Sequence, residues 1–252
     1  GGAGGSAHDL RAVALSRPSP ARLDEDPDAA LRDAEWAALL AALPADDRGR
    51  VLRRVTASCT DASAAGYYAS PRRGGDVRDR YAVLAVRPSS DDVFRALCAG
   101  LATAAAGGEC PPFDVVVLDV SERRPAVVRL EKSSLASLAR CGVALEINYA
   151  AAFSDAGGRV RLNFLRAAQR ITEARVGIRP PVRMMMSSGE RPEHLGKDLG
   201  PIALRTWKDV VNAVSCMVPG VTEELARDMV GSYPGMVVRR AAFRRAGGRV
   251  VG

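Results

Sequence analysis

Residues 181–207 read PVRMMMSSGERPEHLGKDLGPIALRTW, and this stretch decides the fold. An apolar run, Val182 and Met184 to Met186, ends abruptly in the polar residues 187–192 (SSGERP), which we call the elbow. Apolar residues at successive positions are typical of a strand that is buried on both faces. Polar groups just after such a strand lie where α/β folds keep their functional residues. The stretch therefore predicts a parallel sheet and a candidate site.

Strand-like and helix-like segments alternate along the rest of the chain. Strands are expected at residues 11–16, 51–59, 81–86, 113–120, 143–148, 182–188 and 236–240. Helices are expected at residues 28–43, 89–106, 164–176 and 207–217, between Ser133 and Gly142, and from Thr222. This alternation is typical of parallel βα units. A (β/α) barrel needs one more strand than these seven, and its natural place is before Gly1.

Several kinds of chemistry are excluded by the residues that the chain contains. His8 and His194 are the only two histidines, so a metal site with several histidine ligands cannot form. The sequence has no GxSxG elbow, phosphate-binding P-loop or GxGxxG turn. The five cysteines lie far apart without a CxxC pair, which favours free thiols in a reducing compartment. No apolar run approaches about 18 residues, so we expect a soluble protein.

Three acidic residues, Asp114, Asp119 and Glu146, lie in or beside expected buried strands. A buried charge without a partner is costly, so hydrogen bonding of these acids to an arginine inside the fold is the favoured interpretation. The alternative is a catalytic or metal-binding role. The three methionines Met184 to Met186 are expected to fill the core.

The positive charge of the chain is concentrated in its second half. Residues 1–110 contain 14 Lys and Arg against 15 Asp and Glu, whereas residues 111–252 contain 22 against 14. Residues 237–252 contain five arginines and no acid. The planar guanidinium suits phosphate oxygens, so a polyanionic partner such as nucleic acid is one interpretation. A GC-rich genome is the alternative source of the many arginines.

Several segments, in this order, resemble the thirty-kilodalton protein subunit of eukaryotic and archaeal ribonuclease P. They include FDVVVLDVSERRP, LEINYAAAF (residues 145–153) and above all SSGERP at the elbow. The resemblance covers about residues 50–248 and, weakly, residues 10–16. It implies an α/β fold, a TIM-barrel-like (β/α) barrel of the PHP superfamily without that superfamily's histidine-rich metal site, and here without its first β/α unit.

The composition of the chain indicates how it is organised, including an acidic insert without a clear match in the family, and the resemblance implies what the chain does. Residues 1–9 are expected as a flexible leader, residues 10–240 as one domain with an acidic insert at 24–47, and residues 241–252 as an arginine-rich tail. The family binds the RNA of ribonuclease P, and in eukaryotes that of ribonuclease MRP. The RNA removes 5′ leaders from precursor tRNA, so the protein is not expected to be catalytic alone.

Further expectations concern cofactors, partners and location. We expect no cofactor bound by the protein itself, with Mg²⁺ on the RNA partner. The partners are the two RNAs, precursor tRNA indirectly and other protein subunits that include a small α/β protein, but no membrane. We also expect a nuclear, nucleolar location and a part in rRNA processing.

The candidate RNA-binding residues fall into three groups, which are expected to form one surface. They are the elbow with its following loop, a basic loop and the tail: Ser187, Ser188, Arg191 and His194; Arg123, Arg124, Arg129 and Lys132; Arg239, Arg240, Arg244 and Arg245. Hydroxyls and guanidinium groups bind phosphate and ribose. For the elbow, an alternative is that Ser and Gly only make the turn. For the whole chain, the alternatives are a divergent metal-dependent PHP-like phosphoesterase, or a scaffold that no longer binds RNA.

Overall fold

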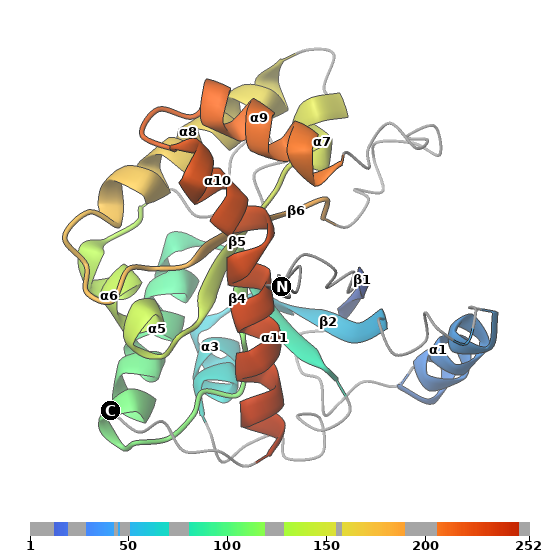
Figure 1. The fold of residues 1–252 in the computed structure, drawn as a ribbon. Coiled ribbons are helices and arrows are strands. Elements are labelled where there is room, and N and C mark those ends of the chain that lie inside the picture. The colour runs from blue at the N-terminus through green and yellow to red at the C-terminus, as the bar shows by residue number, and fades with distance from the viewer. Residues whose placement is uncertain are drawn as a thin grey trace, which may run out of the picture.

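The computed structural model describes residues 13–19, 29–42, 45, 51–70, 81–118, 129–154, 158–189 and 206–246. Its centre is a parallel sheet of six strands in the order β1-β2-β3-β4-β5-β6 (Figure 1). The strands are β1 (Val13–Ser19), β2 (Val51–Cys59), β3 (Val83–Pro88), β4 (Val115–Leu118), β5 (Ala144–Asn148) and β6 (Met184–Ser187). Because all pairs are parallel, the strand starts lie at one edge, the N-terminal edge, and the strand ends at the C-terminal edge.

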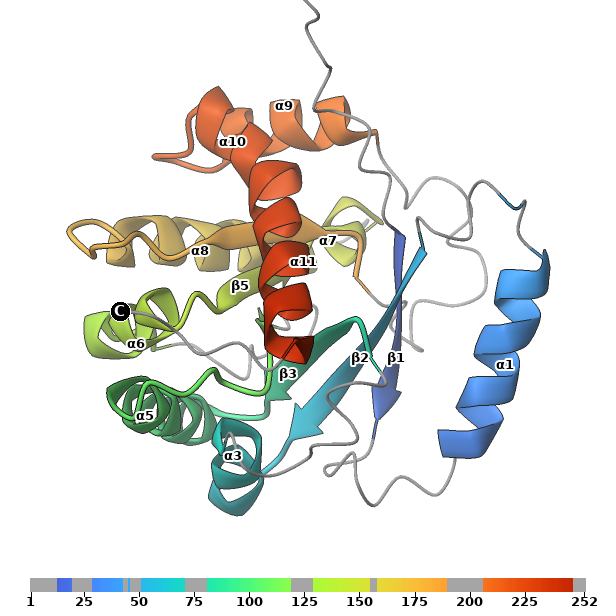
Figure 2. The ribbon, with the colours of Figure 1, turned by 60° about the horizontal axis from the view of Figure 1, so that its bottom comes forward.

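Helices cover both faces of the sheet. On one face lie α3 (Ala62–Ala69), α5 (Asp91–Ala106), α6 (Lys132–Arg140) and α8 (Arg159–Ala174), and α11 (Ser232–Arg245) crosses the other face (Figures 1 and 2). The remaining helices are α1 (Ala29–Ala42), α7 (Ala150–Ser154), α9 (Trp207–Met217) and α10 (Glu223–Val230). None of the described helices is long and apolar enough to cross a membrane.

Burial on both faces explains why apolar residues follow one another in the strands. In β6, Met184 and Met186 lie in the large core against the outer helices, whereas Met185 packs in a smaller cluster with Val237 and Ala241 of α11. Alternate residues of a strand point to opposite faces, so both faces need apolar side chains. The expected core role of the three methionines is confirmed.

Most expected elements are confirmed with small shifts. The strand at residues 51–59 and the helix at 207–217 have the expected bounds, and α1 lies inside the acidic insert. Ser90 and Thr222 cap α5 and α10 through their side chains. Two helix starts differ from the expected ones. Helix α6 begins at Lys132, so Ser133 and Ser134 lie inside it, and α8 begins at Arg159.

The final strand expected at residues 236–240 is wrong, because these residues belong to α11. Two adjacent valines suggested a strand, but Val237 and Ala241 lie one helical turn apart and are both buried against the sheet. Tertiary packing therefore outweighs the local preference of the valines. The domain boundary expected after residue 240 also falls inside this helix, whereas residues 1–9 lie outside the described part.

Candidate functional site

The two segments with the most specific resemblance meet at the C-terminal edge. Asn148, the last residue of β5, lies opposite Ser187, the last residue of β6. The backbone N–H of Tyr149 donates to the carbonyl of Ser187 at 2.9 Å. The Ser187 hydroxyl donates to Glu146 Oε1 and lies 2.9 Å from Asn148 Oδ1. Ser187, the first residue of the elbow, is therefore fixed to the end of the neighbouring strand.

An arginine from a distant strand neutralises Glu146. The Arg54 guanidinium on β2 lies 2.7 Å from Glu146 Oε2, and Glu146 is only 1% exposed. Three strand spacings separate β2 from β5, about 14 Å in a flat sheet, so the Arg54 and Glu146 side chains together span the width of β3 and β4. Arg54 lies opposite Val83, which packs in the α11 cluster, so the pair lies on the α11 face.

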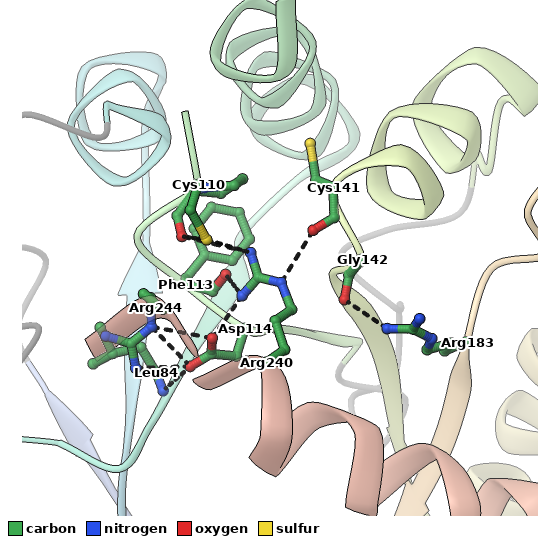
Figure 3. A network of polar contacts seen from close by, with 10 residues as sticks. Leu84, Cys110, Phe113, Asp114, Cys141, Gly142, Arg183, Arg240 and Arg244 are labelled. Atoms are coloured by element: carbon green, nitrogen blue, oxygen red, sulfur yellow. Dashed lines mark hydrogen bonds and ion pairs between the residues drawn. The ribbon is translucent and has the colours of Figure 1, made fainter. Parts of the chain in front are cut away.

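Asp114 is neutralised at the other edge, just before β4 (Figure 3). Arg240 Nη1 donates to Asp114 Oδ1 at 2.6 Å, and Arg244 Nη2 donates to Asp114 Oδ2 at 2.9 Å. Arg240 also donates to the carbonyls of Phe113 and Cys141 at 2.8 and 3.0 Å. Asp114 and Glu146 thus confirm the interpretation that buried acids bond to arginines, while Asp119 lies outside the described residues.

These ion pairs bear on the alternative of a metal-dependent hydrolase. Each of the two carboxylates already has a guanidinium partner, so neither is an open metal ligand. In the part of the chain that the structure describes, no three His, Cys, Asp or Glu side chains come together as a metal site.

The thiols offer no nucleophile in the core. All five cysteines are free, and burial raises the pKa of Cys59 and of Cys98 to about 12. These two thiols therefore stay protonated at neutral pH, and a thiolate rather than a thiol is the nucleophile.

The C-terminal edge carries four of the candidate RNA-binding residues. Ser187 and Ser188 are half-buried at the end of β6. Arg129, which precedes α6, and Lys132, its first residue, are both exposed, and the Arg129 backbone N–H donates to Asp91 at the start of α5 at 2.8 Å. Four further candidates lie outside the described residues: Arg123, Arg124, Arg191 and His194.

The expected tail arginines lie elsewhere and differ among themselves. All four belong to α11, and the contacts of Arg240 and Arg244 place the end of this helix at the N-terminal edge. The guanidinium groups of Arg240 and Arg244 point to Asp114, whereas Arg239 and Arg245 are exposed. The structure therefore does not bring the described residues of the elbow, 187–189, and these arginines together on one surface, because they lie at opposite edges of the sheet.

Three residues at the junction of β5 and β6 were not among the candidates: Gly189 within the elbow, Asn148 beside it, and Arg54, which pairs with Glu146. Gly189 has a φ of 78°, and a Cβ there would come within 2.5 Å of the Asn148 Cγ atom. Only glycine fits this position without strain. The glycine within SSGERP was a readable signal of a special turn, but its contact with Asn148 requires the strand pairing.

Comparison with known proteins places the chain in a family. The model of the family described as RNase P subunit p30 matches residues 13–246. No curated protein matches the chain. The family match spans almost the whole chain and includes both segments that meet at the C-terminal edge. The chain therefore belongs to the RNase P subunit p30 family and is a protein subunit of ribonuclease P.

Proposed function

We propose that this subunit binds the RNA of ribonuclease P with the C-terminal edge of its sheet. The observation that carries the proposal is the junction of β5 and β6, where Ser187 at the start of the elbow is held by Glu146, Asn148 and Tyr149. A rigid junction presents its polar groups in a fixed geometry, which lowers the entropic cost of binding. The exposed cations Arg129 and Lys132 follow β4 at the same edge.

The chemistry of this edge suits an RNA backbone. A hydroxyl group such as that of Ser188 hydrogen-bonds to phosphate and ribose oxygens, and Lys and Arg supply charge attraction. The Ser187 hydroxyl donates its proton to Glu146 and can accept a hydrogen bond from a ribose 2′-OH. In the sequence, Arg123 and Arg124 follow β4, and Arg191 and His194 follow β6, so these residues would add to this edge. The interaction is therefore expected to depend strongly on salt and weakly on base sequence.

In this proposal the RNA performs the hydrolysis of precursor tRNA and the protein stabilises the RNA. The pairing of Glu146 with Arg54 and of Asp114 with Arg240 and Arg244 supports the division of labour, since these acids are already neutralised. The protein then binds no cofactor itself, and Mg²⁺ belongs to the RNA. The phosphoesterase alternative is not favoured.

The proposal extends to the architecture and setting of the subunit. A TIM-barrel-like arrangement of the PHP type is supported by the successive βα units and by the Arg54–Glu146 contact above the sheet face. Further partners are the ribonuclease MRP RNA, other protein subunits that include a small α/β protein, and precursor tRNA indirectly. A nuclear, nucleolar location and a part in rRNA processing belong to the same proposal.

Salt-dependent binding of the full chain to ribonuclease P RNA tests the edge. The variant Arg129→Gln/Lys132→Gln should bind more weakly, and the slope of log K against log salt should fall by about 0.7 to 0.9 for each phosphate that the variant no longer neutralises. The control is Arg166→Gln, because Arg166 is exposed on α8. Equal affinities and slopes for both variants and the unchanged chain would contradict the assignment of the edge.

A further inference from the structure

Arg183 lies at the start of β6, at the N-terminal edge, and was not among the candidate residues. Its Nη1 donates to the carbonyl of Gly142 at a long 3.4 Å (Figure 3). The side chain is half-buried. This contact to a neutral carbonyl gives Arg183 no opposite charge.

The groups around Arg183 are themselves positive. Burial lowers the pKa of Arg183, and the nearby cations Arg240 and Arg239 lower it further, while Tyr233 acts in the opposite direction. No carboxylate stands among these groups within the described part of the chain. The carboxylate of this edge, Asp114, is shared by two guanidinium groups, which leaves an excess positive charge there.

This excess charge cannot be relieved by loss of a proton, because a guanidinium stays protonated in proteins. Solvent screens this charge only in part where it is half-buried, and a bound anion would neutralise it. Guanidinium groups such as those of Arg183 and Arg239 each offer several N–H donors, which match the several oxygens of one phosphate. Arg239 is exposed, and so is Arg140 beside Cys141, so the group is reachable from solvent.

We propose that Arg183 and Arg239 bind a backbone phosphate of the RNA partner at the N-terminal edge, opposite the elbow. The proposal rests on the proposed function and adds a second contact, so that the RNA reaches both edges of the sheet. RNA is favoured over an acidic protein segment because the chain is a ribonuclease P subunit and because the exposed Arg140 and Arg245 continue the positive surface.

Thermal unfolding of the full chain with inorganic phosphate tests the site itself. Phosphate should raise the Tm of the unchanged chain and of Arg166→Gln, but barely that of Arg183→Gln/Arg239→Gln. Without phosphate, the double variant should unfold no earlier than the unchanged chain, because it removes repulsion between cations. Arg240→Gln should unfold earlier, since it leaves Asp114 with one partner fewer. A double variant that is as unstable as Arg240→Gln, or that keeps the phosphate effect, would overturn the site.

Binding to ribonuclease P RNA identifies the source of the phosphate. The double variant should bind more weakly, with a salt slope lower by about 0.7 to 0.9. If its affinity and slope are unchanged while Arg129→Gln/Lys132→Gln binds weakly, the inference fails and the proposed function stands. If the unchanged chain does not bind RNA, the proposed function fails. Loss of another protein subunit from the reconstituted enzyme, with RNA affinity unchanged, would assign the site to an acidic protein segment and overturn the RNA contact.

Discussion

Two buried acids in this subunit have different arginine environments. At the C-terminal half of the sheet, Glu146 has one guanidinium partner, Arg54, and a hydroxyl from Ser187. At the N-terminal edge, Asp114 has two guanidinium partners from α11. The first group is close to electrically balanced and supports the elbow. The second holds a long helix across the sheet and leaves positive charge at the edge. Both acids are thus neutralised by arginine. The group around Glu146 is close to neutral, whereas the group around Asp114 keeps a net positive charge at its edge of the sheet.

Asp114→Asn should have the largest effect on stability. It leaves two buried guanidinium groups without a charged partner, and breaking a buried pair in this way costs about 3 to 5 kcal/mol. Chemical denaturation measures the loss, and the circular dichroism of the folded variant shows whether α11 is kept. A loss below about 1 kcal/mol would mean that α11 is held by its apolar contacts instead.

Glu146→Gln should cost less, about 2 to 3 kcal/mol, because it leaves one unpaired guanidinium. The double variant Arg54→Met/Glu146→Leu should recover most of this loss, since apolar residues of similar volume can replace a buried pair. Denaturation of both variants and of Arg54→Met alone gives the coupling energy. A coupling energy near zero would show that Arg54 and Glu146 do not stabilise each other.

Gly189→Ala should cost about 2 kcal/mol, because it adds strain at a positive φ and a contact with Asn148. Gly108→Ala is a matched control: its φ is 67° and nothing lies within 4 Å of the added Cβ. The control should lose only the strain energy, about 1 kcal/mol, and keep its RNA affinity. Equal stability losses in the two variants would show that the elbow does not depend on Asn148.

High pH should have the smallest effect, at least up to about pH 8.5. The pKa of Cys59 and of Cys98 is raised to about 12 in the folded chain, so the thiols ionise first in the unfolded chain. Their contribution to stability is complete below about pH 8.5, the ordinary thiol pKa, and is lost as the pH rises toward 12. Denaturation midpoints from pH 7 to 9.5 measure it. Cys59→Ala/Cys98→Ala should flatten the profile, and an equally steep fall would assign it to other groups.

The parts of the fold that depend on neighbouring residues were readable from the sequence. Ser90 and Thr222 indicated the starts of α5 and α10, because a capping side chain accepts a hydrogen bond from the backbone N–H three positions later. Two short helices, α3 and α7, were missed, since their alanine-rich sequences have little amphipathic pattern. The bonding of each buried acid to an arginine followed from the cost of burying a charge.

The identity of the partners could not be predicted in the same way. Arg240 and Arg244 meet Asp114 across more than 120 positions, and Arg54 meets Glu146 across three strand spacings. Such pairings depend on how the elements pack, and the arginine-rich segment suggested a free tail because its local sequence lacks acids. The spacing of Arg240 and Arg244, one helical turn apart, was the available sign that both face one partner.

Cross-linking from single introduced cysteines tests whether the C-terminal edge of the sheet faces the RNA. In a Cys216→Ser background, which removes the exposed native thiol, Lys132→Cys and Arg166→Cys are labelled with a photoreactive group and bound to ribonuclease P RNA. We expect RNA cross-links from position 132 and few or none from position 166. Cross-links from position 166 and none from position 132 would contradict it.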